Sequence, residues 1–235
     1  MSTARQVERR VSAIPPGEVF TYDAFSELAA NKAAVAQSLS RMVKCGTLKK
    51  LGRGKFYRPK QGRFGELPLL EQEQLRPALR NGYITGTEAF NRLGLTTQIS
   101  AQVVIAAPGK AYATRIGDLR VKYVRAQVPP TSENAELLMI LDALKQIRRV
   151  PDASPDTIVS VLLKRLKKLN QRQATELVEL GKKYQARVRA LLGAMLEATN
   201  RPKLSARLKE TLNPLTTYKA GVRNALPNSK AWNLQ

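Results

Sequence analysis

Breaker residues divide the first sixty positions into short elements in one order, and this order constrains the fold more than any other feature. Pro15, Pro16 and Gly17 end one helical stretch, and Gly46 ends another. The expected elements are a helix over 4–13, an extended piece over 18–20, a helix from Thr21 through Leu28, a helix over 32–44, and strands over 48–51 and 55–58. Three helices followed by a hairpin predict a winged helix-turn-helix.

The helix over 32–44 has two chemically different faces. At about 100° per residue, Val35, Leu39, Met42 and Val43 share one apolar arc and are expected to face the core. The opposite arc carries small, polar and basic side chains that suit a DNA major groove: Ala33, Gln37, Ser40, Arg41 and Lys44.

Each residue type suggests a role on DNA. Gln37 and Arg41 are suited to base edges, and Lys32 and Lys44 at the helix ends to phosphates. Arg53 and Lys55 occupy the wing, while the helix starts at Thr21 and Asn31 can direct amides toward a phosphate. The predicted DNA-binding residues are Thr21, Asn31, Lys32, Ala33, Gln37, Ser40, Arg41, Lys44, Arg53 and Lys55.

Simpler interpretations of the same segment stay open. A helix with a solvated basic face is common, and helix-turn-helix geometry also serves protein contacts. The run from Gly52 to Lys55 lacks the spacing of a phosphate-binding loop, so no nucleotide site is predicted there. Cys45 is expected to be a small packed residue, since no base is available to activate its thiol.

The chain is strongly basic. Lys and Arg number 40 against 18 Asp and Glu, giving a formal charge of +22. The excess is +8 over residues 1–62, +4 over 63–130 and +10 over 131–235. Such a charge favours a polyphosphate partner, with an anionic membrane or a ribosome-like basic surface as competing interpretations.

The composition excludes several kinds of chemistry. The chain has no histidine and only one cysteine, which removes Ser-His and Cys-His catalysis, Cys/His metal sites and internal disulfides. Paired carboxylates such as Glu71 with Glu73, or Glu176 with Glu179, are better explained as solvated ion pairs than as catalytic groups. We therefore expect no catalysis, metal or cofactor. Without an apolar run of membrane length or a signal peptide, a cytoplasmic location is expected.

Three segments are expected: 1–62, 63–130 and 131–235. The middle one combines a helix over 87–93 with strands over 100–107 and 119–124, a small α+β module. The last is helical by pattern. Its expected helices start near Ser132 and at Ser154, run from 173 to 199 as one long helix, and include a short one marked by Leu204, Leu208 and Leu212 before an irregular end. The predicted class is α+β, mostly helical.

The run from Ser38 to Tyr57, SLSRMVKCGTLKKLGRGKFY, resembles the N-terminal winged helix of AbiEi-type antitoxins from bacterial toxin-antitoxin loci. That family's recurring form is Arg-Leu-Val-Lys-x-Gly followed by Gly-x-Gly-x-Tyr. Residues 82–89 (GYITGTEA) and 93–97 (LGLTT) are similar to its middle module, so the likeness spans residues 7–128.

This resemblance implies a DNA-binding autorepressor. Its implied partners are inverted repeats in its own promoter and a nucleotidyltransferase-like toxin, whose action it would counter as the antitoxin. A different class also stays open: an RNA-binding or ribosome-associated basic protein without operator specificity, in which the helical tail contacts nucleic acid. A preference for one duplex sequence over random duplex at matched salt distinguishes the two.

Overall fold

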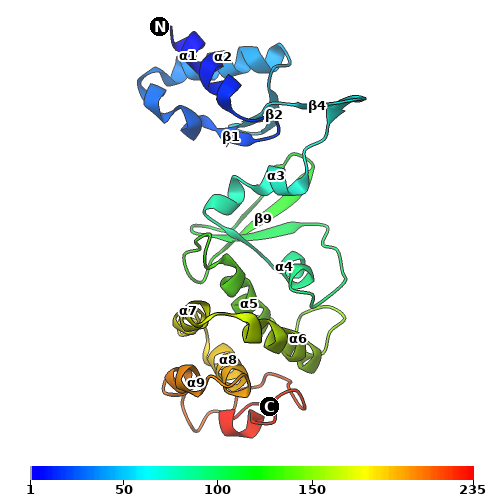
Figure 1. Cartoon of the computed structure of the whole chain (residues 1–235), viewed down its shortest axis with the longest axis vertical. Coiled ribbons are helices and arrows are strands. Elements are labelled where there is room, and N and C mark those ends of the chain that lie inside the picture. The colour runs from blue at the N-terminus through cyan, green and yellow to red at the C-terminus, as the bar shows by residue number, and fades with distance from the viewer. Residues whose placement is uncertain (1) are drawn as a thin grey trace. The chain divides into compact units, whose positions relative to one another are not determined.

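The computed structural model describes residues 2–235 and has a mixed α+β architecture, mostly helical, as the sequence predicts. The chain divides into two compact units (Figure 1). Unit 1 comprises Met1–Arg80 and Thr114–Arg120, and unit 2 comprises Asn81–Ala113 and Val121–Gln235.

The first part of unit 1 follows the expected order of elements. They are α1 (Thr3–Ala13), β1 (Val19–Thr21), a 3₁₀ segment (Tyr22–Asn31), α2 (Lys32–Lys44), β2 (Lys49–Gly52) and β3 (Lys55–Tyr57). The strands form an antiparallel sheet in the order β1-β3-β2. Its core cluster holds eight residues: Val7, Val11, Phe20, Phe25, Val35, Leu39, Leu48 and Phe56.

The middle helix of the expected three is irregular. Tyr22–Asn31 is a 3₁₀ segment whose backbone leaves helical geometry at Phe25 and Leu28. The ring of Phe25 packs edge-on against that of Phe20, with centroids 5.9 Å apart. The irregular backbone thus accompanies the burial of Phe25, which a continuous helical pattern does not anticipate.

The rest of unit 1 contains elements that the sequence pattern missed. They are β4 (Lys60–Gly62), β5 (Gly65–Leu67), α3 (Glu71–Leu75) and a 3₁₀ turn (Ala78–Arg80). Lys49 Nζ lies 2.6 Å from Glu66 Oε2, and Lys60 pairs with Glu73. Glu73 is thus in an ion pair, as expected, whereas Glu71 has none among the described residues. The backbone N–H of Gly117 donates to Leu51 O at 2.9 Å, which holds the 114–120 turn in unit 1.

A four-stranded sheet runs through β6 (Tyr83–Thr85), β7 (Val103–Ala107), β9 (Leu119–Arg125) and β8 (Tyr112–Ile116), in that order. β7 pairs antiparallel with β6 and parallel with β9. The short helix α4 (Thr87–Arg92) follows β6 directly. Gly86, with φ +71°, makes that sharp connection, because such backbone geometry strains any other residue. β7 lies within the expected strand over 100–107, and β9 extends the expected strand over 119–124 by one residue. The sequence pattern does not predict β6 and β8.

After α4, unit 2 continues with helices of which α5 (Ala135–Lys145) packs against β6, while the others pack on α5 or on one another. The others are α6 (Pro155–Lys168), α7 (Gln171–Gly181), α8 (Ala186–Ala198), α9 (Pro202–Lys209) and a 3₁₀ turn (Ser229–Trp232). Ser154 caps α6 as predicted, since its Oγ accepts the N–H of Thr157 at 3.1 Å.

The expectation of one helix over 173–199 is wrong. Two helices, α7 and α8, are separated by residues 182–185. The break turns Tyr184 inward, where its hydroxyl donates to Asp142 Oδ1 at 3.0 Å. The three- and four-residue spacing of apolar side chains continues through the break and conceals it.

Middle and C-terminal segments share one core, which differs from the expected boundary at Pro129. Tyr83, Phe90 and Leu93 belong to the same buried cluster as the side chains of α5 to α9. The chain end, expected to be irregular, contributes the buried Trp232 to this cluster, over Gly193 of α8. A cut near Pro129 would therefore expose the core side of the sheet.

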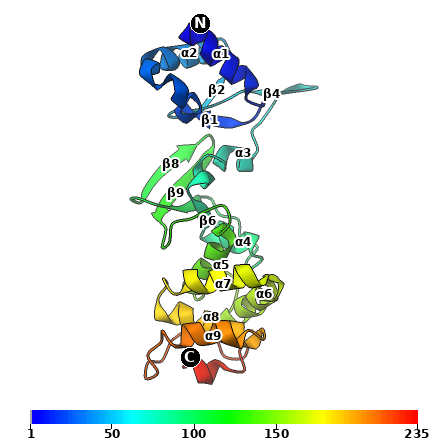
Figure 2. The same ribbon diagram turned by 60° about the vertical axis from the view of Figure 1, so that its left-hand side comes forward.

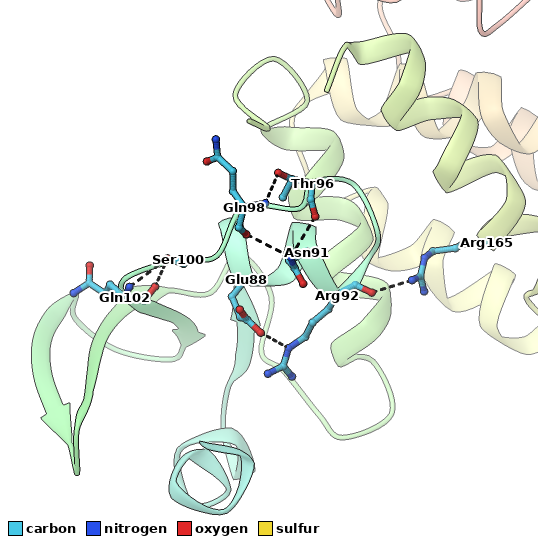
Figure 3. Close-up of polar contacts among 8 residues, drawn as sticks. All are labelled: Glu88, Asn91, Arg92, Thr96, Gln98, Ser100, Gln102 and Arg165. Atoms are coloured by element: carbon cyan, nitrogen blue, oxygen red, sulfur yellow. Dashed lines mark hydrogen bonds and ion pairs between the residues drawn. The ribbon is translucent and has the colours of Figure 1, made fainter. Parts of the chain in front are cut away.

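Polar contacts hold the loop after α4 against α6 (Figure 3). Arg92 Nε donates to Glu88 Oε1 at 2.8 Å. The Asn91 side-chain amide donates to the Thr96 carbonyl at 3.3 Å, and Arg165 Nη2 donates to the Arg92 carbonyl at 3.0 Å. Both arginines in this group are thus engaged.

Candidate nucleic-acid interface

The apolar arc predicted for α2 faces the core of unit 1. Leu39 is fully buried and Val35 is 3% exposed. Met42 and Val43 are half-buried and pack against the same cluster. The predicted rotation of the helix is confirmed, and with it the identity of the side chains that face away from the core.

The opposite face of α2 is exposed at each predicted position. Its residues are Ala33, Gln37, Ser40, Arg41 and Lys44. Within residues 2–235, none of the polar members of this face forms a side-chain hydrogen bond or an ion pair. The small Ala33 leaves room for close approach of another surface, while the neighbouring side chains keep their full hydrogen-bonding capacity.

The end of α2 is formed as predicted but Cys45 is not packed. Gly46, with φ +74°, follows the C-cap residue Cys45. The thiol is exposed, which corrects the expectation of a small buried residue. Cys45 is exposed because it lies one position past Lys44, outside the apolar arc of α2.

The β2–β3 hairpin forms a basic projection next to α2 in the chain. Arg53 and Gly54 make its two-residue tip, where Gly54 has φ +68°. Arg53 is exposed and without an ion-pair partner among the described residues. Lys55 is half-buried, and this burial lowers the pKa of its ammonium. Arg53 is therefore the more accessible cation of the two.

Two predicted helix-start contacts differ in the structure. Thr21 Oγ1 donates to Asp23 Oδ2 at 2.8 Å and accepts the N–H of Asp23, so this hydroxyl and this amide are engaged within the chain. Asn31 is exposed at the start of α2, but its side chain makes no capping hydrogen bond. Lys32 beside it is exposed and unpaired among the described residues, as a phosphate contact requires. Thr21 is therefore not included among the residues proposed to contact DNA.

The β4–β5 hairpin is a second exposed projection of unit 1, which the sequence pattern missed. Arg63 and Phe64 form its tip, between Gly62 and Gly65. Phe64 is 95% exposed, and the Arg63 guanidinium lies 5.6 Å from the centre of its ring. In both views the hairpin extends away from the rest of unit 1 (Figures 1 and 2). The Gly-x-x-Gly spacing is the sequence signal that would have predicted this turn.

Two kinds of feature are absent from the described residues. No group of three or more His, Cys, Asp or Glu side chains is arranged to hold a metal ion within residues 2–235. In the same range, none of the helices combines the length and apolar character needed to cross a membrane.

Comparisons with known proteins give a family match and structural matches. A solved structure described as "Crystal structure of RV2827C protein from Mycobacterium tuberculosis" is 15% identical, with 91% of this chain and 82% of that chain covered and a TM-score of 0.38. No curated protein matches the chain. The model of a family of unknown function, DUF6088, matches residues 6–174. The chain therefore belongs to the DUF6088 family.

Proposed function

We propose that unit 1 binds double-stranded DNA sequence-specifically, with α2 in the major groove. The observation that carries this proposal is the exposed, unpaired row of Gln37, Ser40 and Arg41 on the side of α2 opposite its buried arc. Amide and guanidinium groups of this kind form bidentate hydrogen bonds with adenine and guanine edges. Lys32 and Lys44 at the two helix ends are suited to the flanking phosphates.

Duplex DNA is favoured over double-stranded RNA by the shape of the site. An α-helix enters the wide major groove of B-form DNA, whereas the major groove of A-form RNA is too deep and narrow for side chains to read. Arg53 on the adjacent hairpin supplies a cation for the backbone or the minor groove. The RNA-binding or ribosome-associated alternative remains the second candidate, supported by the excess of basic residues in the helical tail.

The resemblance to AbiEi-type antitoxins supports a more specific role as an autorepressor and antitoxin. In this role the DNA is the chain's own promoter, with inverted repeats, and the functional partner is a nucleotidyltransferase-like toxin. Co-expression with a nucleotidyltransferase-like gene from the same locus tests it. Growth rescue is expected, and continued toxicity alongside intact promoter binding would separate repression from the antitoxin role.

The DNA proposal is tested by binding the full chain to its own promoter and to random duplex at matched salt. Gln37→Ala and Arg41→Ala are each expected to cost about 1–3 kcal/mol on the promoter and little on random DNA, because they remove base contacts. Lys164→Ala, an exposed cation of α6 without an ion pair among the described residues, serves as control. Equal losses on both DNAs would reject base reading by α2.

Phosphate contacts are tested separately through the salt dependence of binding. Lys44→Ala and Arg53→Ala are expected to weaken binding to every sequence and to lower the salt slope by roughly one contact each. An unchanged slope would show that these cations do not lie on the DNA backbone.

A further inference from the structure

Unit 2 contains a half-open cavity of about 800 Å³ beside its sheet. One face of the sheet forms the floor, through Tyr83, Thr85, Val104, Ala106 and Val124. The register places these residues together, since Tyr83 is paired with Ala106 and Thr85 with Val104 across β6 and β7. The walls come from α5, from the loop after it and from the start of α8.

Five basic side chains line this cavity: Arg125, Lys145, Arg148, Arg149 and Arg187. Across the described chain, none of them lies within ion-pair distance of a carboxylate. Arg92 of the same unit, by contrast, pairs with Glu88 (Figure 3). Arg165 pairs with Glu136. The cavity thus gathers cations that the fold leaves without anionic partners.

The single carboxylate in the cavity wall, Asp142, is only 7% exposed and is occupied by hydroxyl groups. Its Oδ2 accepts from Tyr83 at 2.9 Å and from Thr85 at 2.7 Å, and its Oδ1 accepts from Tyr184 at 3.0 Å. Burial, reinforced by the Asp142 charge, raises the pKa of Tyr83 and of Tyr184. Both tyrosines therefore stay protonated donors, and Asp142 is held in place by hydrogen bonds rather than by the cations around it.

Arg187 is a fixed cation in the cavity wall. Its Nη2 donates to the Lys145 carbonyl at 2.9 Å, which fixes the guanidinium between α8 and the end of α5. Its Nε is buried and has no hydrogen-bond partner in the part of the chain that the structure describes. A buried donor without an acceptor is costly to the fold. Because this nitrogen is closed to solvent, Arg187 acts on the cavity through the positive charge of its guanidinium and not through Nε.

From these observations we propose that this cavity binds a compact polyphosphate anion, a function separate from DNA binding by unit 1. Five cations facing one half-enclosed space concentrate a positive field there, and arginine forks bind phosphate oxygens bidentately. The volume lies within the range of small-molecule sites, roughly 300–1,000 Å³, which accommodates a nucleotide or a short phosphate chain but not a DNA duplex.

The test measures binding of inorganic tripolyphosphate and of a nucleoside triphosphate to the full chain by titration calorimetry at constant ionic strength. Arg148→Gln with Arg149→Gln is expected to weaken the binding of both probes at least tenfold. Arg125→Gln, on β9, is expected to weaken it several-fold, because the ligand contacts the sheet side of the cavity as well as its helical walls. The control pair, Lys167→Gln with Lys168→Gln on α6, removes the same charge and should change affinity less than twofold.

Comparing tripolyphosphate with the nucleoside triphosphate shows whether the cavity recognises the phosphate chain alone or a whole nucleotide. Tighter binding of the nucleotide would indicate that base or ribose also contacts the cavity, and equal binding that phosphates alone are recognised. Absence of binding, or equal losses in cavity and control variants, would overturn the proposal. It would also be overturned if a DNA duplex displaced the probe from the wild type with the same dependence on Arg148 and Arg149. Because the DNA test reports unit 1 and this test unit 2, either proposal can fail alone.

Discussion

Unit 1 and unit 2 both leave basic side chains without partners, but they place them differently. In unit 1 the free cations lie on an exposed helical face and a hairpin tip around a core cluster of eight residues. In unit 2 the free cations surround a cavity whose wall holds a buried carboxylate. The hydrophobic core cluster of unit 2 is also much larger than that of unit 1. An open row suits an extended polymer, and a half-enclosed cluster suits a compact anion. Net charge alone would not separate these two cases.

The largest effect is expected from Leu39→Asp, which tests whether the small core of unit 1 unfolds independently of the larger core of unit 2. We expect it to unfold unit 1, because an unpaired charge at this fully buried position costs about 4 kcal/mol or more, close to the whole stability of a small domain. Trp232, the only tryptophan, lies in unit 2, so its fluorescence transition should stay unchanged while helical circular dichroism falls.

Ser40→Asp provides the matched control, since Ser40 is exposed next to Leu39 on α2. It should leave the circular dichroism of the folded chain unchanged. If the Trp232 transition shifted along with unit 1 in Leu39→Asp, the two units would fold as one and the contrast between their cores would disappear.

Alkaline pH is expected to destabilise unit 2 through its buried tyrosines. The pKa values of Tyr83 and Tyr184 are raised in the folded state, so above about pH 10 the unfolded chain loses these protons first and stability falls. Each tyrosine contributes a slope of about 1.4 kcal/mol per pH unit. Urea unfolding followed by Trp232 fluorescence at pH 9 to 11 measures it.

Tyr184→Phe is the comparison for this pH experiment. It lowers stability at neutral pH by removing a hydrogen bond to Asp142, but the fall above pH 10 should be shallower than in the wild type. Parallel slopes in the two proteins would mean that Tyr184 does not carry the alkaline sensitivity.

The smallest effect is expected at Glu197. Its carboxylate accepts from Trp232 Nε1 at 2.6 Å and from Asn228 at 2.7 Å, and these bonds hold its pKa below the usual value. The stabilisation is present above about pH 4.3 and fades as pH falls through the lower folded pKa. Because Glu197 is exposed, Glu197→Gln should cost less than about 1 kcal/mol at pH 7.

Glu197→Gln should also flatten the acid dependence of the Trp232 emission spectrum between pH 5 and pH 3, since glutamine does not titrate. An unchanged acid dependence would assign that signal to another carboxylate of unit 2.

The sequence predicted unit 1 well where local chemistry decides the structure. Gly46 and the tip at Gly54 require left-handed backbone, and the α2 arc follows from periodicity alone. The exposed face of α2 was therefore named correctly. The kinked segment after Thr21 was not, because burial of Phe25 against Phe20 is a tertiary contact that no local pattern encodes.

Unit 2 was less predictable because its key features join distant segments. The break before α8 depends on Tyr184 reaching Asp142, 42 residues away. The cavity combines residues of β6, β7, β9, α5 and α8, each unremarkable in its own stretch of sequence. Short strands such as β6 and β8 carry too few residues for alternation to be read.

The exposed thiol at the end of α2 gives the molecule a built-in chemical reporter. Cys45 is the only cysteine and lies next to Lys44 in unit 1, while the only tryptophan lies in unit 2. Alkylation kinetics at Cys45 should slow when DNA covers α2 and stay constant when a polyphosphate occupies the other unit. Indole emission follows unit 2 in the same sample. The unmodified chain thus has one probe in each unit, a thiol in unit 1 and an indole in unit 2. DNA binding and polyphosphate binding can therefore be followed in the same sample.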